Sequence, residues 1–306
     1  MMKRVLLIGG GGTLGLYTAE ELLRLGHRVD IISLDEQISK NENLKFYKAD
    51  ATVEYLSDLF SSTRYDGIVN FIHYRDWRDY IPYHALLTQN TEHLIFLSSY
   101  RVYADTSHPI TEDCAQLIDA VTDDPELIER DDYGISKSRA ERFLRDNPYP
   151  KNWTIVRPVT SFSDRRLDIV VTSGTEVVKA ARAGKAVQLP LEAKDLTAGL
   201  DWAGNSGKLI ANLLFKPECI GEAYTVSTAQ NLTWGEVAEL YTKILGVRFE
   251  WVKANFPNDL WIWHYDRAYD RRIDNTKILR ATGLGAADFK TVEEGIAIEL
   301  KKLGAI

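Results

Sequence analysis

Short apolar runs alternate with amphipathic segments from the N-terminus to Pro158. The apolar runs have the length of buried strands, and the amphipathic segments carry apolar residues at helical spacing. The predicted strands span 5–8, 28–33, 44–47, 67–72, 93–98 and 153–156, and the predicted helices span 13–25, 53–60, 81–91 and 133–146. Strands that alternate with helices predict a parallel sheet covered by helices on both faces.

The pattern weakens after Arg157, where only 176–183, 205–215 and 234–245 read as helices and aromatic residues crowd 249–269. We therefore expect a doubly wound α/β domain over 1–165, with return segments at about 195–228. A smaller mixed lobe that binds substrate is expected from 166–194 and 229–306. The aromatic residues either stack on a sugar or a base or pack the core of this lobe.

Composition and charge narrow the class of protein. The formal net charge of -7 and the lack of a basic stripe argue against nucleic acid or an anionic membrane as the main partner. No segment offers the roughly 20 apolar residues of a membrane span. The two cysteines, Cys114 and Cys219, are far apart and fit a reduced, cytoplasmic setting. The histidines are too scattered to predict a metal site.

A glycine-rich turn follows the first predicted strand and opens the first predicted helix. Its glycines, Gly9, Gly12 and Gly15, permit a tight turn, close approach to a pyrophosphate and close packing of helix against strand. Thr13 and Leu14 begin the helix, whose free N–H groups favour phosphate. The turn predicts a dinucleotide site, because strand, glycines and helix stand in the required order.

The end of the second predicted strand is expected to meet the adenosine ribose. The segment 30–36 contains acids, and no basic residue precedes Lys40. Acids in this place bind ribose hydroxyls and favour NAD, although NADP stays possible. Asp30 either lies mid-strand or contacts the ribose, and Asp35 either contacts the ribose or lies beyond it.

Tyr133 and Lys137 stand four residues apart at the start of a predicted helix, so they share one helical face. A neighbouring ammonium stabilises a phenolate and makes tyrosine a usable base near neutral pH. The fifth predicted strand ends in Ser98 and Ser99, at the edge of the sheet where open parallel sheets bind ligands. Ser99 is therefore expected to hydrogen-bond the substrate oxygen, unless the two serines only cap the strand.

These motifs together resemble the extended short-chain dehydrogenase/reductase family, which includes NAD-dependent epimerases and dehydratases. Ala49-Asp50-Ala51, Arg157-Pro158 and the late segment 275–279 agree with that resemblance. It implies a Rossmann-type fold, an acid/base role for Tyr133, a tuning role for Lys137 and a substrate hydrogen bond from Ser99. The expected cofactor contacts are Gly9, Gly12, Thr13, Leu14, Gly15, Ser33, Asp35, Asp50, Ala51, Phe71, His73, Ser98, Tyr133, Lys137 and Pro158.

The sequence also departs from the family pattern. Tyr100 and Arg101 stand where dehydratases of the family carry an Asp-Glu pair after the catalytic hydroxyl, so dehydration is disfavoured. Thr160 replaces an asparagine common in nucleotide-sugar epimerases. Ser99, Tyr100, Arg101, Thr160 and Arg271 are the expected substrate contacts. The pairs 165–166 and 271–272 are arginines that either meet an anion or lie at the surface. The acidic segment 104–132 is expected to be a surface loop rather than a lid.

The resemblance implies an NAD(P)-dependent epimerase or oxidoreductase that acts on a sugar or nucleotide-sugar, as a homodimer assembled through the helices at 81–91 and 133–146. Three alternatives stay open: a reductase of a non-sugar ketone, a dinucleotide-sensing regulator without enzymatic activity, and an RNA-binding relative of chloroplast stem-loop binding proteins. An intact Ser99, Tyr133 and Lys137 argues against a sensor, and the net acidity argues against RNA binding.

Overall fold

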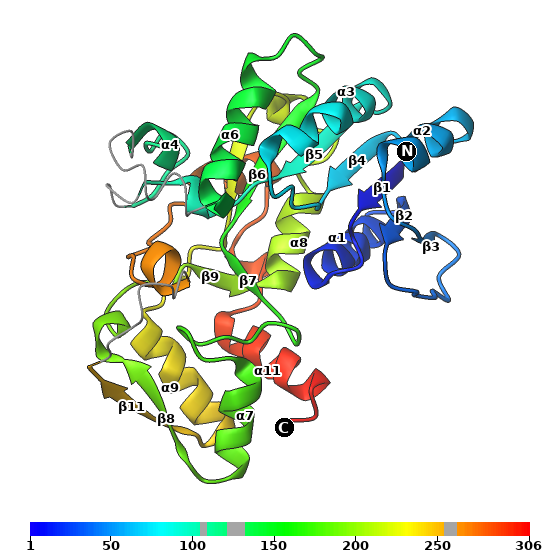
Figure 1. Cartoon of the computed structure of the whole chain (residues 1–306). Helices are drawn as coiled ribbons and strands as arrows, with labels where there is room; N and C mark the ends of the chain where they lie inside the picture. The colour runs from blue at the N-terminus through cyan, green and yellow to red at the C-terminus, as the bar shows by residue number, and fades with distance from the viewer. Residues whose placement is uncertain (105–108, 121–131, 254–261) are drawn as a thin grey trace.

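A seven-stranded, fully parallel sheet forms the centre of the fold (Figure 1). We analysed a computed structural model of the chain, which describes residues 1–104, 109–120, 132–253 and 262–306. The strand order is β10-β6-β5-β4-β1-β2-β3. The strands are β1 (Arg4–Ile8), β2 (Arg28–Ser33), β3 (Leu44–Lys48), β4 (Gly67–Asn70), β5 (His93–Leu97), β6 (Trp153–Pro158) and β10 (Ala223–Val226).

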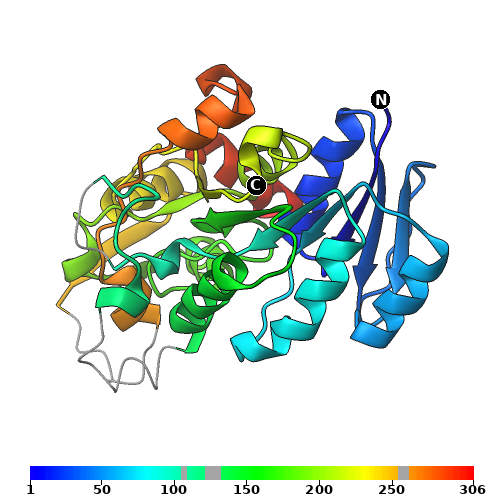
Figure 2. The same ribbon diagram turned by 90° about the horizontal axis from the view of Figure 1, so that it is seen from above.

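Helices cover both faces of this sheet, as the alternating pattern predicted. Figure 2 shows one group of helices on each side of the strands. One face carries α1 (Thr13–Arg24), α8 (Ala203–Ala211) and α10 (Thr276–Thr282), and the other carries α2 (Val53–Ser62), α3 (Ile81–Gln89) and α6 (Asp132–Asp146). Each face buries its own apolar cluster, so the doubly wound α/β fold is confirmed.

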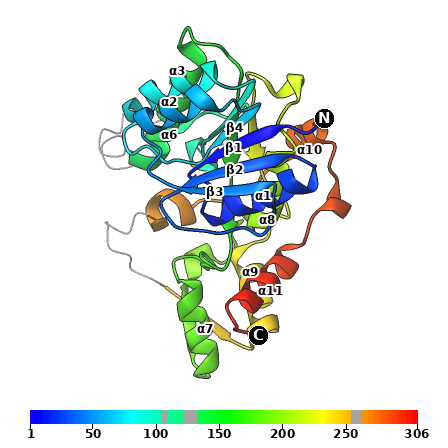
Figure 3. The same ribbon diagram turned by 90° about the vertical axis from the view of Figure 1, so that its right-hand side faces the viewer.

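A smaller group of elements packs beside the sheet around a third apolar cluster and lies below the sheet in Figures 1 and 3. It contains two parallel strand pairs and three longer helices. These elements are β7 (Thr160–Phe162) with β9 (Leu200–Trp202), β8 (Ala186–Pro190) with β11 (Arg248–Val252), α7 (Gly174–Arg182), α9 (Trp234–Leu245), α11 (Val292–Lys302) and the π-helix η5 (Trp263–Arg267). The mixed lobe is therefore present. Trp251 and Trp263 pack against its cluster.

Short helical segments join the larger elements. They are η1 (Trp77–Tyr80), η2 (Tyr100–Val102), α4 (Leu117–Ala120), η3 (Leu191–Ala193), η4 (Pro217–Cys219) and η6 (Ala286–Asp288). Most of the acidic segment 104–132, and Trp261 of the aromatic segment, fall outside the described residues. No helix in the described part of the chain is long and apolar enough to cross a membrane.

Two sequence predictions need correction. The fourth strand ends at Asn70 rather than residue 72, because the Asn70 side chain turns the chain by accepting a hydrogen bond from the Ile72 amide at 3.1 Å. The helix predicted over 205–215 ends at Ala211, and Phe215 takes a left-handed φ of 65°. The strand β10 was not predicted at all.

Candidate active site

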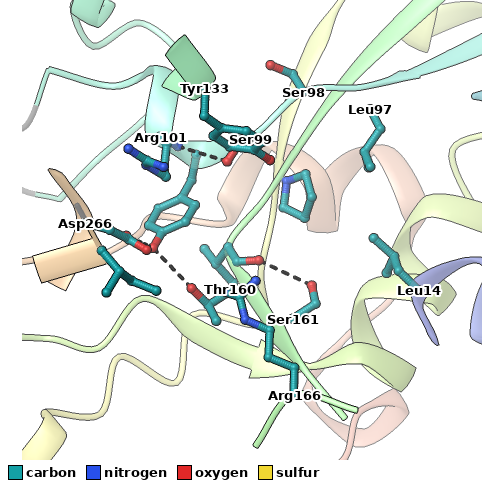
Figure 4. Close-up of a pocket in the computed structure, with 14 residues that line it drawn as sticks. Leu14, Leu97, Ser98, Ser99, Arg101, Tyr133, Thr160, Ser161, Arg166 and Asp266 are labelled. Atoms are coloured by element: carbon teal, nitrogen blue, oxygen red, sulfur yellow. Dashed lines mark hydrogen bonds between the residues drawn. The ribbon is translucent and has the colours of Figure 1, made fainter. Parts of the chain in front are cut away.

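A cavity of about 490 Å³ opens where β5 and β6 end, between the sheet and the smaller lobe (Figure 4). The edge at which parallel strands end is where ligands bind in open α/β sheets. Its lining comes from α1, the ends of β5 and β6, the start of α6 and the segment around η5. The residues are Leu14, Leu97, Ser98, Ser99, Tyr100, Arg101, Tyr133, Pro158, Val159, Thr160, Ser161, Arg166, Ile262 and Asp266.

Both predicted serines line this cavity directly after β5. Ser99 caps the short helix η2, and its Oγ accepts a hydrogen bond from the Arg101 amide at 3.2 Å. The Oγ of Ser98 is buried and has no hydrogen-bond partner among the described residues. A buried hydroxyl without a partner is costly, and this one points away from Ser99 and Tyr133 in Figure 4.

Tyr133 begins the first turn of α6 and faces Ser99, with which its hydroxyl hydrogen-bonds. The guanidinium carbon of Arg101 lies 5.2 Å from the centre of the Tyr133 ring, and the ring of His73 packs at 4.8 Å. Burial raises the pKa of the Tyr133 phenol. Ser99, Arg101 and Arg166 oppose that rise, and the net pKa stays above its usual value.

Lys137 follows one turn later on α6 and is buried. Its Nζ donates a hydrogen bond to the Leu97 carbonyl at 2.6 Å, which holds α6 against the end of β5. Burial lowers the pKa of Lys137 to about 8, although the charge of Glu141 opposes this shift. The amine is therefore still mostly protonated at pH 7, although its charged form is less favoured than that of an exposed lysine.

The wall opposite Tyr133 is a buried polar network. The Tyr100 hydroxyl donates to Asp266 and lies 3.2 Å from Thr160 Oγ1, and Arg267 Nη1 donates to Asp266 Oδ2 at 2.8 Å. Burial raises the pKa of Asp266, but Arg267, Arg101 and Tyr100 outweigh it and the net pKa is lowered. The carboxylate is therefore ionised and holds the Tyr100 hydroxyl. Thr160 is held by Tyr100 and by Arg267 Nη1, which donates to its Oγ1 at 3.0 Å.

Among the charged lining residues, Asp266 was missed by the sequence analysis, whereas Arg166 belongs to the arginine pair for which an anion contact and a surface position were both open. Asp266 lies within the aromatic segment that was assigned to stacking or core packing, and its signal was an Asp-Arg pair in an apolar setting. Arg166 lines the cavity from the loop after β7. Arg271, a predicted substrate contact, is buried behind Tyr100 with its guanidinium carbon 5.3 Å from that ring.

The glycine turn has the geometry that a dinucleotide requires. Gly9 has a left-handed φ of 70°. A Cβ on Gly15 would lie 2.3 Å from the Gly10 carbonyl oxygen, so α1 packs on the turn only because residue 15 lacks a side chain. The space at Gly12, which begins α1 without a side-chain cap, is open. The N–H groups of the first turn are thus available to a phosphate.

The other predicted cofactor contacts follow the ends of neighbouring strands. Ser33 ends β2, and its Oγ accepts a hydrogen bond from the backbone amide of Asp35 at 3.2 Å. The Asp35 side chain is exposed. Asp50 is exposed after β3, whereas Ala51 is buried, and the Phe71 amide donates to the Ile8 carbonyl at 2.9 Å.

The position of Asp30 is settled by the structure. Its carboxylate is buried in mid-strand and accepts hydrogen bonds from Arg4 at 2.6 Å and Tyr65 at 2.7 Å. Asp30 is therefore a structural acid, and the exposed acids of this segment are Asp35 and Glu36. Within the described residues, no group of three acids, histidines or cysteines gathers as metal ligands.

Comparisons with known proteins agree with this geometry. The model of the NAD-dependent epimerase/dehydratase family matches residues 5–203. A search of curated protein sequences finds no match. Among solved structures, epimerase Mth375 from Methanothermobacter thermautotrophicus superposes with a TM-score of 0.76 at 15% identity, covering 99% of this chain and 92% of that one.

Two further solved structures share the fold. UDP-glucose 4-epimerase from Thermotoga maritima, solved with UDP-glucose, gives a TM-score of 0.71 at 17% identity and covers 98% of both chains. The enzyme WbmG from Bordetella bronchiseptica, solved with NAD, gives a TM-score of 0.74 at 18% identity, over 100% of this chain and 96% of that one. At such identities the similarity demonstrates a common fold.

Proposed function

The chain belongs to the NAD-dependent epimerase/dehydratase family, and on that premise we propose that it is an NAD-dependent epimerase or oxidoreductase. Its substrate in this proposal is a sugar or nucleotide-sugar that reacts at a carbon bearing a hydroxyl group. The observation that carries the proposal is the meeting of Ser99 and Tyr133 in one cavity, which also contains Leu14 of the glycine turn. The family supports NAD, and the acids at 30–36 favour it over NADP.

In the proposed mechanism, the substrate hydroxyl enters between Ser99 and Tyr133. Ser99 Oγ donates a hydrogen bond to the substrate oxygen, and Tyr133 Oη accepts the proton of the hydroxyl as the carbon is oxidised. NAD, when bound, would accept the hydride. In an epimerase the ketone would turn within the cavity and be reduced on its other face, and Tyr133 would return the proton. A dehydrogenase would release the ketone, and a reductase would run the same transfer in reverse with Tyr133 as the proton donor.

Tyr133 must be deprotonated to act as a base, yet burial alone disfavours the phenolate. Ser99, Arg101 and Arg166 all lower the Tyr133 pKa. In this proposal Lys137 assists from the same helical face and binds the nicotinamide ribose.

The cavity wall supports epimerisation or oxidoreduction rather than loss of water. Elimination of water needs a second acid and base beside the reacting carbon. The two residues after Ser99 provide neither, because the Tyr100 hydroxyl is bound to Asp266 and Arg101 is a permanent cation. A sugar is favoured by the polar hydroxyls of Thr160 and Ser161 in the lining and by the solved epimerase with UDP-glucose.

The first test replaces Tyr133 by Phe. Loss of an acid/base group typically costs a factor of about 10² to 10⁴ in rate, so Tyr133→Phe is expected to lose that much turnover and keep wild-type NAD affinity. Tyr149→Phe, which changes a partly buried tyrosine outside the cavity, is the matched control. Undiminished turnover in Tyr133→Phe removes this residue from the mechanism.

The nucleotide retained by the purified protein separates the two reaction types. NAD released on unfolding indicates a cofactor that is recycled in each turnover, and points to epimerisation of a nucleotide-sugar. An empty protein that binds added NADH or NADPH points to net reduction of a ketone. Assembly as a homodimer through α3 and α6 belongs to the same proposal, and a monomeric mass at all concentrations contradicts it.

A further inference from the structure

A tight turn after β7 carries two arginines to two different cavities. Ser163 and Arg166 close this turn by reciprocal backbone hydrogen bonds of 3.0 and 2.9 Å, which leaves Asp164 and Arg165 at its tip. Arg166 lines the large cavity together with Leu14. Arg165 lines a smaller cavity of about 200 Å³ together with Thr13. The turn therefore reaches both sides of the first turn of α1.

The first half of the turn is fixed by two partly buried hydrogen bonds. Ser163 Oγ donates to Thr13 Oγ1 at 3.0 Å, and the Asp164 amide donates to Glu299 Oε2 at 2.9 Å. Glu299 is fully buried in α11 and also accepts a hydrogen bond from the Trp202 indole at 2.7 Å. The smaller lobe thus holds this turn in a set position against the glycine turn.

The guanidinium of Arg165 lies on the glycine turn itself. Its Nη1 donates to the Gly11 carbonyl at 3.4 Å, one residue before the open N-terminus of α1. The residues of the glycine turn include no cation of their own. Among the described residues that line the small cavity, the cations are Arg165 and Lys302 and the acids are Glu20 and Asp164. Lys302 is already bound to Glu299 at 3.2 Å.

A dinucleotide brings a doubly charged pyrophosphate to this place, whereas a helix N-terminus offers only about half a positive charge. A guanidinium matches phosphate oxygens bidentately and keeps its charge at every physiological pH. We propose that Arg165 is a ligand of the cofactor pyrophosphate, contributed by the smaller lobe across the glycine turn. This inference rests on the proposed function, because it requires a dinucleotide on that turn.

The consequence is that one turn would contact both ligands. Arg165 meets the cofactor, while its neighbour Arg166 lines the larger cavity, which the proposed function assigns to the substrate. A lysine at position 165 keeps part of the effect, since an ammonium binds phosphate as a point charge without the bidentate geometry.

The test measures binding rather than turnover. Calorimetric titrations of NAD, ADP-ribose and adenosine compare the wild type with Arg165→Ala and Arg165→Lys. Arg182→Ala is the matched control, because Arg182 is also exposed and also bonds a backbone carbonyl, that of Gly304 at 2.9 Å. Arg165→Ala is expected to weaken NAD and ADP-ribose by about ten- to a hundredfold, with adenosine unchanged and Arg165→Lys in between. Arg182→Ala retains wild-type affinities.

Three results separate the possibilities. Wild-type NAD affinity in Arg165→Ala overturns the inference and leaves the proposed function intact. Equal weakening of adenosine and NAD also overturns it, because the variant then damages the whole site rather than the phosphate contact. A wild-type protein that binds neither NAD nor ADP-ribose overturns the proposed function itself, and the inference with it.

Discussion

The buried ion pair between Glu141 and Arg157 offers a sharp test of how α6, the helix that carries Tyr133, is held. Both side chains are fully buried, and Arg157 donates to the two carboxylate oxygens of Glu141 at 2.9 and 2.6 Å. Arg157 also donates to the Tyr103 hydroxyl at 2.9 Å. Burial lowers the pKa of Arg157, but Glu141 and Tyr103 outweigh it and the net pKa is raised, so the guanidinium stays charged. The pair joins α6 to the end of β6.

Removing one partner leaves the other as an uncompensated buried charge. That loss typically costs about 3–5 kcal/mol, whereas replacing a whole buried pair by apolar residues of similar size is often neutral or stabilising. Glu141→Gln keeps the size of the side chain but removes its charge, so we expect a loss of about 3–5 kcal/mol in the free energy of unfolding. Arg157→Met is expected to cost a similar amount. The double variant Glu141→Gln/Arg157→Met should recover much of either loss, because it buries no uncompensated charge.

Equilibrium unfolding in urea at pH 7 measures these differences, with the slope of each transition checked to confirm that the unfolded states are comparable. Non-additivity of the double variant is the decisive quantity, since neighbouring charges couple and distant ones do not. Two results refute the reasoning: a Glu141→Gln variant within about 1 kcal/mol of the wild type, or a double variant as unstable as the sum of the two single losses.

Two further predictions concern the cofactor turn and the lysine. Gly15→Ala is expected to lower both stability and NAD affinity, because its Cβ would lie 2.3 Å from the Gly10 carbonyl oxygen. Gly12→Ala should keep its stability and lose only NAD affinity, since the structure leaves the space at residue 12 open. Urea unfolding and NAD titration distinguish the two variants, and equal losses of stability contradict the assignment. Burial lowers the pKa of Lys137 to about 8, below its unfolded value of about 10.4. The unfolded state therefore holds more protons between these pH values, and the wild type should gain stability relative to Lys137→Met as pH rises from 8 towards 10; a pH-independent difference contradicts the shift.

Several helices and strands could be predicted because they carry their own local signals. The helix at Thr13 is bounded by a glycine turn and by Gly26, which has a φ of 83°, and the observed element is Thr13–Arg24. The strand Arg28–Ser33 and the helix Trp234–Leu245 have the predicted bounds. In the latter case, a capping box formed by Thr233 and Glu236 fixes the N-terminus.

The elements that escaped prediction depend on partners far along the chain. The strand Ala223–Val226 is short, and it is a strand because it pairs with β6, in register with Ile155 through Pro158. The strands β8 and β11 pair across about sixty residues, with Ala186 opposite Arg248. Such short segments have no periodicity to read, since tertiary pairing decides their structure.

The residues of the candidate site also divide into those that a local motif predicts and those that only the folded chain brings to the cavity. Ser99 and Tyr133 were predicted from motifs and meet in one cavity. Ser99 follows the end of β5, and Tyr133 begins α6, which the bond from Lys137 to the Leu97 carbonyl holds against that strand end. Asp266 and Arg166 come from the smaller lobe. No motif marks Asp266, and the arginine pair 165–166 left an anion contact and a surface position both open. Their place in the cavity follows from how that lobe packs, which is a property of the folded chain rather than of any local pattern.

The helix α6 links the stability of the fold to the proposed chemistry. Tyr133, Lys137 and Glu141 follow one another at intervals of four residues, so they share one helical face. The last of them is clamped to Arg157 on β6, and the middle one is bonded to the Leu97 carbonyl at the end of β5. The charge of Glu141 also raises the Lys137 pKa. Loss of the Glu141 charge, as in Glu141→Gln, should therefore loosen α6 and lower the Lys137 pKa further. We expect this variant to lose turnover even under conditions in which it is fully folded, although Glu141 does not line the cavity.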